Sequence, residues 1–213
     1  MSKPFSAGFL IFPGFPMSCL TSMIEPLRAA NEISGADAFC WQLVAETPDK
    51  VPSSALVDFD PNCALQDAGG LDLLILLSAP TAQFQLPATQ GRLRSMQRHG
   101  VKLGAVSGGV FPLVRAGLAA DAPLSVHWCY SAAFAAEFPH HISSDRVIEI
   151  TNAHMTASGA AAAFDLSLHL IEKQLGPKVA TEVACWFQHP VIRREGVVQA
   201  IPALQSDAQG EQF

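Results

Sequence analysis

The most informative stretch of this sequence is Gly104-Ala105-Val106-Ser107-Gly108-Gly109-Val110-Phe111. It follows an apolar, strand-like run over 101–106 and begins a helix-like run over 108–116. A strand that turns sharply into a helix at a serine flanked by small residues presents that side chain at the mouth of a sheet, near the positive end of the helix. The stretch therefore predicts that Ser107 is either a catalytic nucleophile or part of a turn with the geometry of a catalytic site that only binds a ligand.

Strand-like and helix-like segments alternate outward from this turn in both directions. Because alternating strands and helices form a parallel sheet covered on both faces, the sequence predicts an α/β fold, with the run 71–77, aliphatic after Asp72, at the centre of the sheet. The predicted strands are 5–12, 41–46, 55–59, 71–77, 101–106 and 124–127, followed by a hairpin over 147–156, and the predicted helices are 18–33, 89–99, 108–116, 129–138, 159–175 and 178–187.

Composition places the chain among single-domain globular proteins. It has 213 residues, of which 49% are hydrophobic and 15% charged, enough for one large domain with a substantial core. We predict that this domain spans residues 1–195 and that 196–213 form a polar tail or linker. The net charge is −6 and there is no basic tract, so the sequence gives no indication of a nucleic-acid-binding surface. No apolar segment is long enough to span a bilayer, so no membrane contact is expected.

Cysteine usage indicates a reducing compartment. The five cysteines are widely spaced, odd in number and free of CxxC pairs, which disfavours a disulfide framework or a zinc site. Free thiols fit a cytoplasmic protein. His140, His141 and Glu149 lack partners at metal-ligand spacing, so neither a metal nor a cofactor is expected. The apolar run after Lys3 is interrupted by proline and glycine, and we interpret it as a core strand rather than a secretory leader.

Three turns that follow apolar strands are expected to line one crevice. In parallel sheets, ligands bind at the carboxyl ends of the strands, where the connections to the helices converge. The turns are Pro13–Met17, Ser78–Thr81 and Ser107–Gly109.

A catalytic serine needs a base within hydrogen-bonding reach. By topology His127 and His154 are the candidates, and no Asp or Glu is placed to orient either of them. We therefore expect Ser107 to contact a ligand rather than attack it, with a purely structural turn as the alternative. His127 and Trp128 fit a pocket wall and a buried core position equally well.

Five other residues are expected to have structural roles. Cys19 suits a small buried hydrophobic residue better than a pocket residue. Asp165 and His169, four residues apart, resemble a polar pair on one helix face, and Arg193-Arg194 resembles a solvated surface pair.

The order of motifs resembles the ThiJ/PfpI branch of the class I glutamine amidotransferase-like superfamily, and more narrowly the N-terminal domain of AraC-type regulators. The resemblance runs from about Phe5 to Arg194. It is carried by Pro13-Gly14-Phe15, Glu25-Pro26-Leu27-Arg28-Ala29-Ala30-Asn31, Val106-Ser107-Gly108-Gly109-Val110-Phe111, Ala116-Gly117-Leu118, His127-Trp128 and Ala163-Phe164-Asp165-Leu166 through Leu175-Gly176. It implies a flavodoxin-like three-layer sandwich, with a mostly parallel sheet between helices.

Departures from the family pattern fall on the catalytic positions. Catalytic members carry cysteine where this chain has Ser107, and Cys19 stands where some members place an acidic residue. The turn after the central strand is usually Gly-Gly, whose N–H groups can face an oxyanion. Here it is Ser78-Ala79-Pro80, and Pro80 has no N–H to donate.

The resemblance implies a non-catalytic domain of an AraC-type regulator that binds a small-molecule effector, with amino-acid-like and quaternary-amine compounds allowed. The alternative is a ThiJ/PfpI-type hydrolase, hydratase or glyoxalase-like enzyme using Ser107. A homodimer is expected, and DNA contact is expected only through a helix-turn-helix domain that this chain does not contain. We expect no catalytic residues, and the predicted pocket residues are Ser107, Gly108, Gly109, Phe15, Cys19, Ser78, Ala79, His127 and Trp128.

Overall fold

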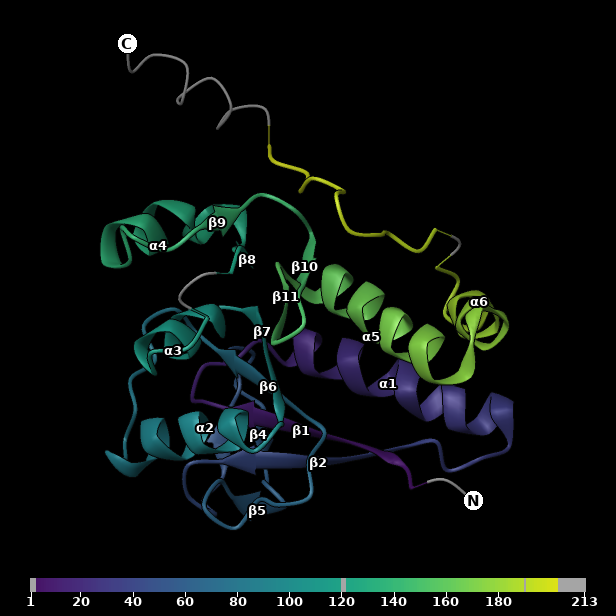
Figure 1. Ribbon diagram of the computed structural model, residues 1–213, viewed down its shortest axis with the longest axis horizontal. Coiled ribbons are helices and arrows are strands. Elements are labelled where there is room, and N and C mark those ends of the chain that lie inside the picture. The colour runs from purple at the N-terminus through teal and green to yellow at the C-terminus, as the bar shows by residue number, and fades with distance from the viewer. Residues whose placement is uncertain (1–2, 120–121, 190, 203–213) are drawn as a thin grey trace.

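A seven-stranded sheet forms the centre of the computed structural model, which describes residues 3–119, 122–189 and 191–202 (Figure 1). Its strand order is β10-β11-β7-β6-β1-β2-β5, and all neighbours are parallel except the edge pair β10 and β11. The strands are β1 (Phe5–Ile11), β2 (Phe39–Ala45), β5 (Cys63–Ala64), β6 (Leu73–Ser78), β7 (Lys102–Ser107), β10 (Ile148–Ile150) and β11 (His154–Ala157).

Helices cover both faces of this sheet, as Figure 1 shows. One apolar cluster joins one face to α1 (Met17–Ser34), α5 (Ala160–Leu175) and α6 (Pro177–Trp186). A second cluster joins the other face to α2 (Ala88–Arg98), α3 (Val110–Arg115) and α4 (Ser131–Glu137). The predicted three-layer α/β sandwich is confirmed.

The central strand follows from its composition. All six residues of β6 are buried, because a strand covered by helices on both faces has no solvent-facing side. It pairs with β1 on one side and β7 on the other, as predicted for the run 71–77.

The short segments differ from the predictions. The strand expected at 55–59 is instead a small hairpin of β3 (Val51–Pro52) and β4 (Asp58–Phe59), with Leu56 in the turn at a φ of 60°. The strand expected at 124–127 is shortened to β8 (Leu124–Ser125), which pairs with β9 (Ser143–Ser144) outside the main sheet. Such segments are too short to show a hydrophobic period.

The boundary predicted at residue 195 stays a prediction, and positions 203–213 of the predicted tail lie outside the described residues. Within the described part of that segment, Val198 forms an isolated antiparallel bridge with Arg146. None of the described helices is both long enough and apolar enough to cross a membrane.

Candidate functional site

The turn at the end of β7 has the strained geometry of a nucleophile elbow. Ser107 has a φ of 55°, in the left-handed region that residues with a side chain seldom adopt. It is buried, with 7% of its surface exposed. Such strain costs of order 1–3 kcal/mol and persists where the surrounding structure enforces it, often at functional sites.

Two glycines allow this turn to press against the neighbouring strand. A Cβ atom at Gly108 would overlap the Ser78 carbonyl oxygen, and one at Gly109 would overlap the Leu76 carbonyl oxygen. The Ser78 hydroxyl also donates a hydrogen bond of 3.0 Å to the Gly108 carbonyl. The backbone of Gly108 and Gly109 therefore packs closely against β6. This packing and the hydrogen bond from Ser78 fix the elbow.

The three predicted turns do converge. An ideal Cβ at Gly14, in the turn after β1, would lie 3.5 Å from the Cβ of Ala79, in the turn after β6. Ala79 is half-buried. Since Ser78 contacts Gly108, the carboxyl ends of β1, β6 and β7 meet at one edge of the sheet.

Phe15 and Cys19, the other predicted residues near β1, lie in the core. Phe15 is fully buried and packs edge-on against Phe59, with ring centroids 5.2 Å apart. Cys19 is 2% exposed, and burial raises the pKa of its thiol to about 12. Cys19 therefore supplies neither an acid nor a thiolate at neutral pH.

The Tyr130 side chain lies close to Ser107, and the sequence analysis missed this residue. Burial raises the pKa of Tyr130. Tyr130 belongs to the 3-10 turn η1 (Trp128–Tyr130). The available signal was that it is the single tyrosine of the chain and directly follows the His127-Trp128 motif.

His127 is not arranged to act as the general base for Ser107. Its Nδ1 accepts the backbone N–H of Cys129 at 3.3 Å and lies 2.9 Å from the Cys129 sulfur. The ring proton therefore belongs on Nε2, which faces Gly159 at the start of α5. Burial lowers the pKa of His127, which favours this neutral form.

The second candidate base, His154, is outside the site. It begins β11 and pairs in register with Leu103, whereas the elbow lies at the opposite end of β7. Its Nε2 is 2.8 Å from the side-chain nitrogen of Gln97. Among the described residues, no carboxylate contacts either His127 or His154, as expected.

Trp128 and His127 border a cavity of about 210 Å³ beside the elbow. Their rings are 5.4 Å apart, and the Trp128 backbone N–H donates to the Gln199 side chain at 3.0 Å. The other wall comes from the start of α5 and from Arg193 and Gln199. Ser107 is absent from the lining, so the structure separates the predicted residues into an elbow group and a cavity group.

Arg193 and Asp165 correct two expectations. Asp165 is fully buried and accepts hydrogen bonds from Arg193 Nε at 2.6 Å and from the Arg193 backbone N–H at 3.0 Å. His189 Nε2 lies 2.8 Å from the same carboxylate. Asp165 is thus an anchor for the chain after α6 rather than a partner of His169, and Arg193 is not a solvated surface residue.

Comparisons with curated proteins identify relatives among transcriptional regulators. The chain is 32% identical to the HTH-type transcriptional regulator GbdR of Pseudomonas aeruginosa, over 94% of this chain and 55% of that protein. It is 31% identical to the HTH-type transcriptional regulator CdhR of the same species, over 84% of this chain and 53% of that protein. The chain thus spans about half the length of the curated relatives it matches. No family model matches.

Comparisons with solved structures support the fold. An AraC family transcriptional regulator from Pseudomonas putida superposes with a TM-score of 0.77 at 23% identity, over 86% of this chain and 100% of that one. A ThiJ/PfpI family protein from Pseudomonas syringae gives a TM-score of 0.74 at 16% identity, over 97% of this chain and 85% of that one. The predicted resemblance to the ThiJ/PfpI fold and to AraC-type regulators is confirmed.

Proposed function

We propose that this chain is a non-catalytic effector-binding domain of an AraC-type transcriptional regulator. The premise is that it has the ThiJ/PfpI fold and resembles HTH-type regulators over nearly its whole length. A small metabolite binds at the carboxyl ends of the strands and shifts a conformational or dimer equilibrium. Amino-acid-like and quaternary-amine compounds are the first classes to test.

The observation that carries this proposal is the engagement of His127, the candidate base beside the elbow, by Cys129. His127 Nδ1 accepts the Cys129 backbone N–H, and the Tyr130 side chain lies close to Ser107. Removal of the serine proton needs a free, oriented base, so this arrangement favours binding over nucleophilic attack.

In this proposal, DNA is contacted by a helix-turn-helix unit outside this chain. The net charge of this chain is −6, which is unsuited to binding a phosphate backbone. Such a regulator works in the cytoplasm and acts as a homodimer, because regulators of this kind bind paired sites.

A thermal-shift screen of amino-acid and quaternary-amine metabolites tests the binding function. Ligand at 100 times its dissociation constant adds roughly 2.7 kcal/mol to the free energy of unfolding. We expect a saturable rise in melting temperature with at least one compound. A screen with no shift at millimolar concentrations would count against an effector domain.

The strain at Ser107 favours a second candidate, a ThiJ/PfpI-type hydrolase, hydratase or glyoxalase-like enzyme, since a φ of 55° is a geometry that exposes nucleophiles. Incubation with simple amides, isonitriles and methylglyoxal distinguishes the two functions. Turnover that disappears in Ser107→Ala would establish the enzyme and overturn the non-catalytic proposal.

A further inference from the structure

The cavity beside His127 and Trp128 is bounded on one side by the segment that leaves the domain. We name residues 191–199 the exit strap. In Figure 1 this segment runs from α6 past the start of α5 toward β8 and β9. Arg193 and Gln199 of the exit strap line the cavity, facing His127 and the α5 residues Ala160–Ala162. A molecule in this space therefore touches both the domain body and the exit strap.

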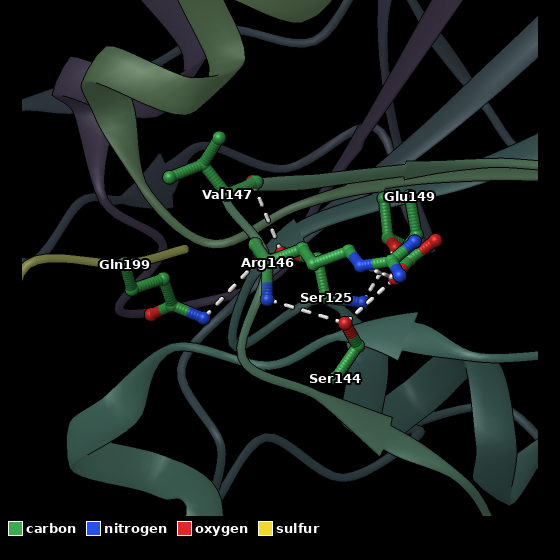
Figure 2. Close-up of polar contacts among 7 residues, drawn as sticks. Ser125, Ser144, Arg146, Val147, Glu149 and Gln199 are labelled. Atoms are coloured by element: carbon green, nitrogen blue, oxygen red, sulfur yellow. Dashed lines mark hydrogen bonds and ion pairs between the residues drawn. The ribbon is translucent and has the colours of Figure 1, made fainter. Parts of the chain in front are cut away.

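The exit strap is held at both ends. At one end Arg193 binds the fully buried Asp165. At the other end the Gln199 side chain donates to the carbonyls of Val126 at 2.8 Å and Arg146 at 3.3 Å, as Figure 2 shows for Arg146. The Gln199 backbone N–H also donates to the Asp145 carbonyl at 2.8 Å. The cavity lies between these anchors.

Two side chains that carry hydrogen-bond donors, Arg193 and His127, line the cavity. Arg193 binds Asp165 through Nε and lines the cavity with a side chain that is 30% exposed; its Nη2 atom is buried and is not the part of the guanidinium that a ligand reaches. The lowered pKa and the occupied Nδ1 of His127 place its proton on Nε2, near Gly159. A ligand that supplies an acceptor can form hydrogen bonds with both groups.

The volume gives the size of the group that the cavity can hold. Apolar cavities of about 150 Å³ hold a benzene molecule, so a cavity of about 210 Å³ admits a compound somewhat larger than benzene. Charged acceptors give the strongest hydrogen bonds to arginine, and a carboxylate matches the planar guanidinium.

We propose that this cavity binds the carboxylate group of a small organic acid through Arg193 and His127 Nε2, and that the bound acid holds the exit strap in place. This inference rests on the proposed effector-binding function and adds the ligand class, the location and the responding segment. The ligand site is then the cavity next to the elbow, with Ser107 outside it.

Binding is tested with acetate, propionate and benzoate as sodium salts, at fixed ionic strength, against acetamide, propionamide and benzamide. We expect the three acids to raise the melting temperature of the full chain saturably and the amides to have no effect. Equal effects of acids and amides, or none from either series, would overturn the carboxylate assignment.

Two variants locate the site. Arg193→Gln removes the guanidinium from the cavity wall and should weaken acid binding about tenfold to a hundredfold, the usual effect of a lost charged hydrogen bond. Ala161→Phe leaves the Asp165 anchor intact, because Ala161 is exposed at the cavity edge, and should block entry. Arg194→Gln is the matched control, since Arg194 pairs with Glu172 outside the cavity. Unchanged acid binding in Ala161→Phe would place the site elsewhere.

The response of the exit strap is read by trypsin cleavage after Arg194, which is exposed. Benzoate should slow this cleavage several-fold in the unmodified chain and leave it unchanged in Ala161→Phe. Acid binding without protection would disprove the strap's role. A metabolite that binds equally well to the unmodified chain and to both cavity variants would leave the effector function standing while refuting this site.

Discussion

Asp165, fully buried on α5, binds Nε of Arg193 at 2.6 Å and ties the chain beyond α6 to the domain body. Removing one partner of a buried pair leaves an uncompensated charge and typically costs 3–5 kcal/mol. Because 30% of the Arg193 side chain is exposed, we expect Asp165→Ala to lower the free energy of unfolding by about 3 kcal/mol, at the low end of that range. Urea denaturation measures this loss.

The control for this prediction is Glu172→Ala, which breaks the exposed pair with Arg194. Surface ion pairs contribute about 0–1 kcal/mol, so the control should remain close to the unmodified protein. Hydrogen exchange should increase over residues 191–199 only in Asp165→Ala. Similar losses in both variants would mean that Asp165 does not anchor the exit strap.

The partners of Asp165 could not be predicted from the sequence. Helical spacing correctly placed Asp165 on a long helix, but an interval of four residues pointed to His169 as its partner. The actual partners, His189 and Arg193, follow a second helix, and their approach depends on how α6 packs against α5. Contacts of this kind leave no periodic signal in the sequence.

The elbow was more predictable because its cause is local. The apolar strand, the small residues and the helix after Ser107 specify a sharp turn, which the structure confirms with a φ of 55°. The crevice formed by three turns followed from the general topology of parallel sheets. The approach of Tyr130 to Ser107 depends on a 3-10 turn that no spacing rule revealed.

Strain at Ser107 should be measurable by comparing two substitutions that both remove the hydroxyl. Glycine adopts a φ of 55° without penalty, whereas alanine retains a Cβ that opposes it. We expect Ser107→Gly to be more stable than Ser107→Ala by about 1 kcal/mol, despite the greater chain entropy of glycine. Equal stability in guanidinium denaturation would mean that the turn relaxes freely and stores little strain.

Gly109 should be among the least replaceable residues of the elbow. A Cβ there would overlap the Leu76 carbonyl, which belongs to the central strand and cannot move without disturbing the sheet. We expect Gly109→Ala to cost about 3 kcal/mol or more of unfolding free energy, within the overpacking range. Thermal denaturation followed by circular dichroism measures this cost.

Gly91 provides the matched control for the same substitution. It lies inside α2 with no atom within 4 Å of its ideal Cβ. Gly91→Ala should therefore stabilise the protein by about 0.5–1 kcal/mol through improved helix propensity. A destabilised Gly91→Ala, or a neutral Gly109→Ala, would contradict the packing described for the elbow.

The buried His154 should make stability depend on pH. Burial, followed by the nearby Lys102, lowers the pKa of His154 below its usual value of 6.5. The folded state therefore holds the neutral ring, and the unfolded chain takes up a proton first as the pH falls. The stabilising contribution is complete above about pH 6.5 and is lost as the pH falls from there through the folded-state pKa.

This dependence should appear as a decline in unfolding free energy between pH 7 and pH 5 (a range set by the usual histidine pKa of about 6.5), measured by urea denaturation. His127 and His169, whose pKa values are also lowered by burial, add to the decline. His154→Gln cannot be protonated and should flatten the profile, and the same substitution at the exposed His140 is the matched control. If His154→Gln keeps the full slope, the decline arises from other groups, because only a group whose pKa differs between folded and unfolded states contributes to it.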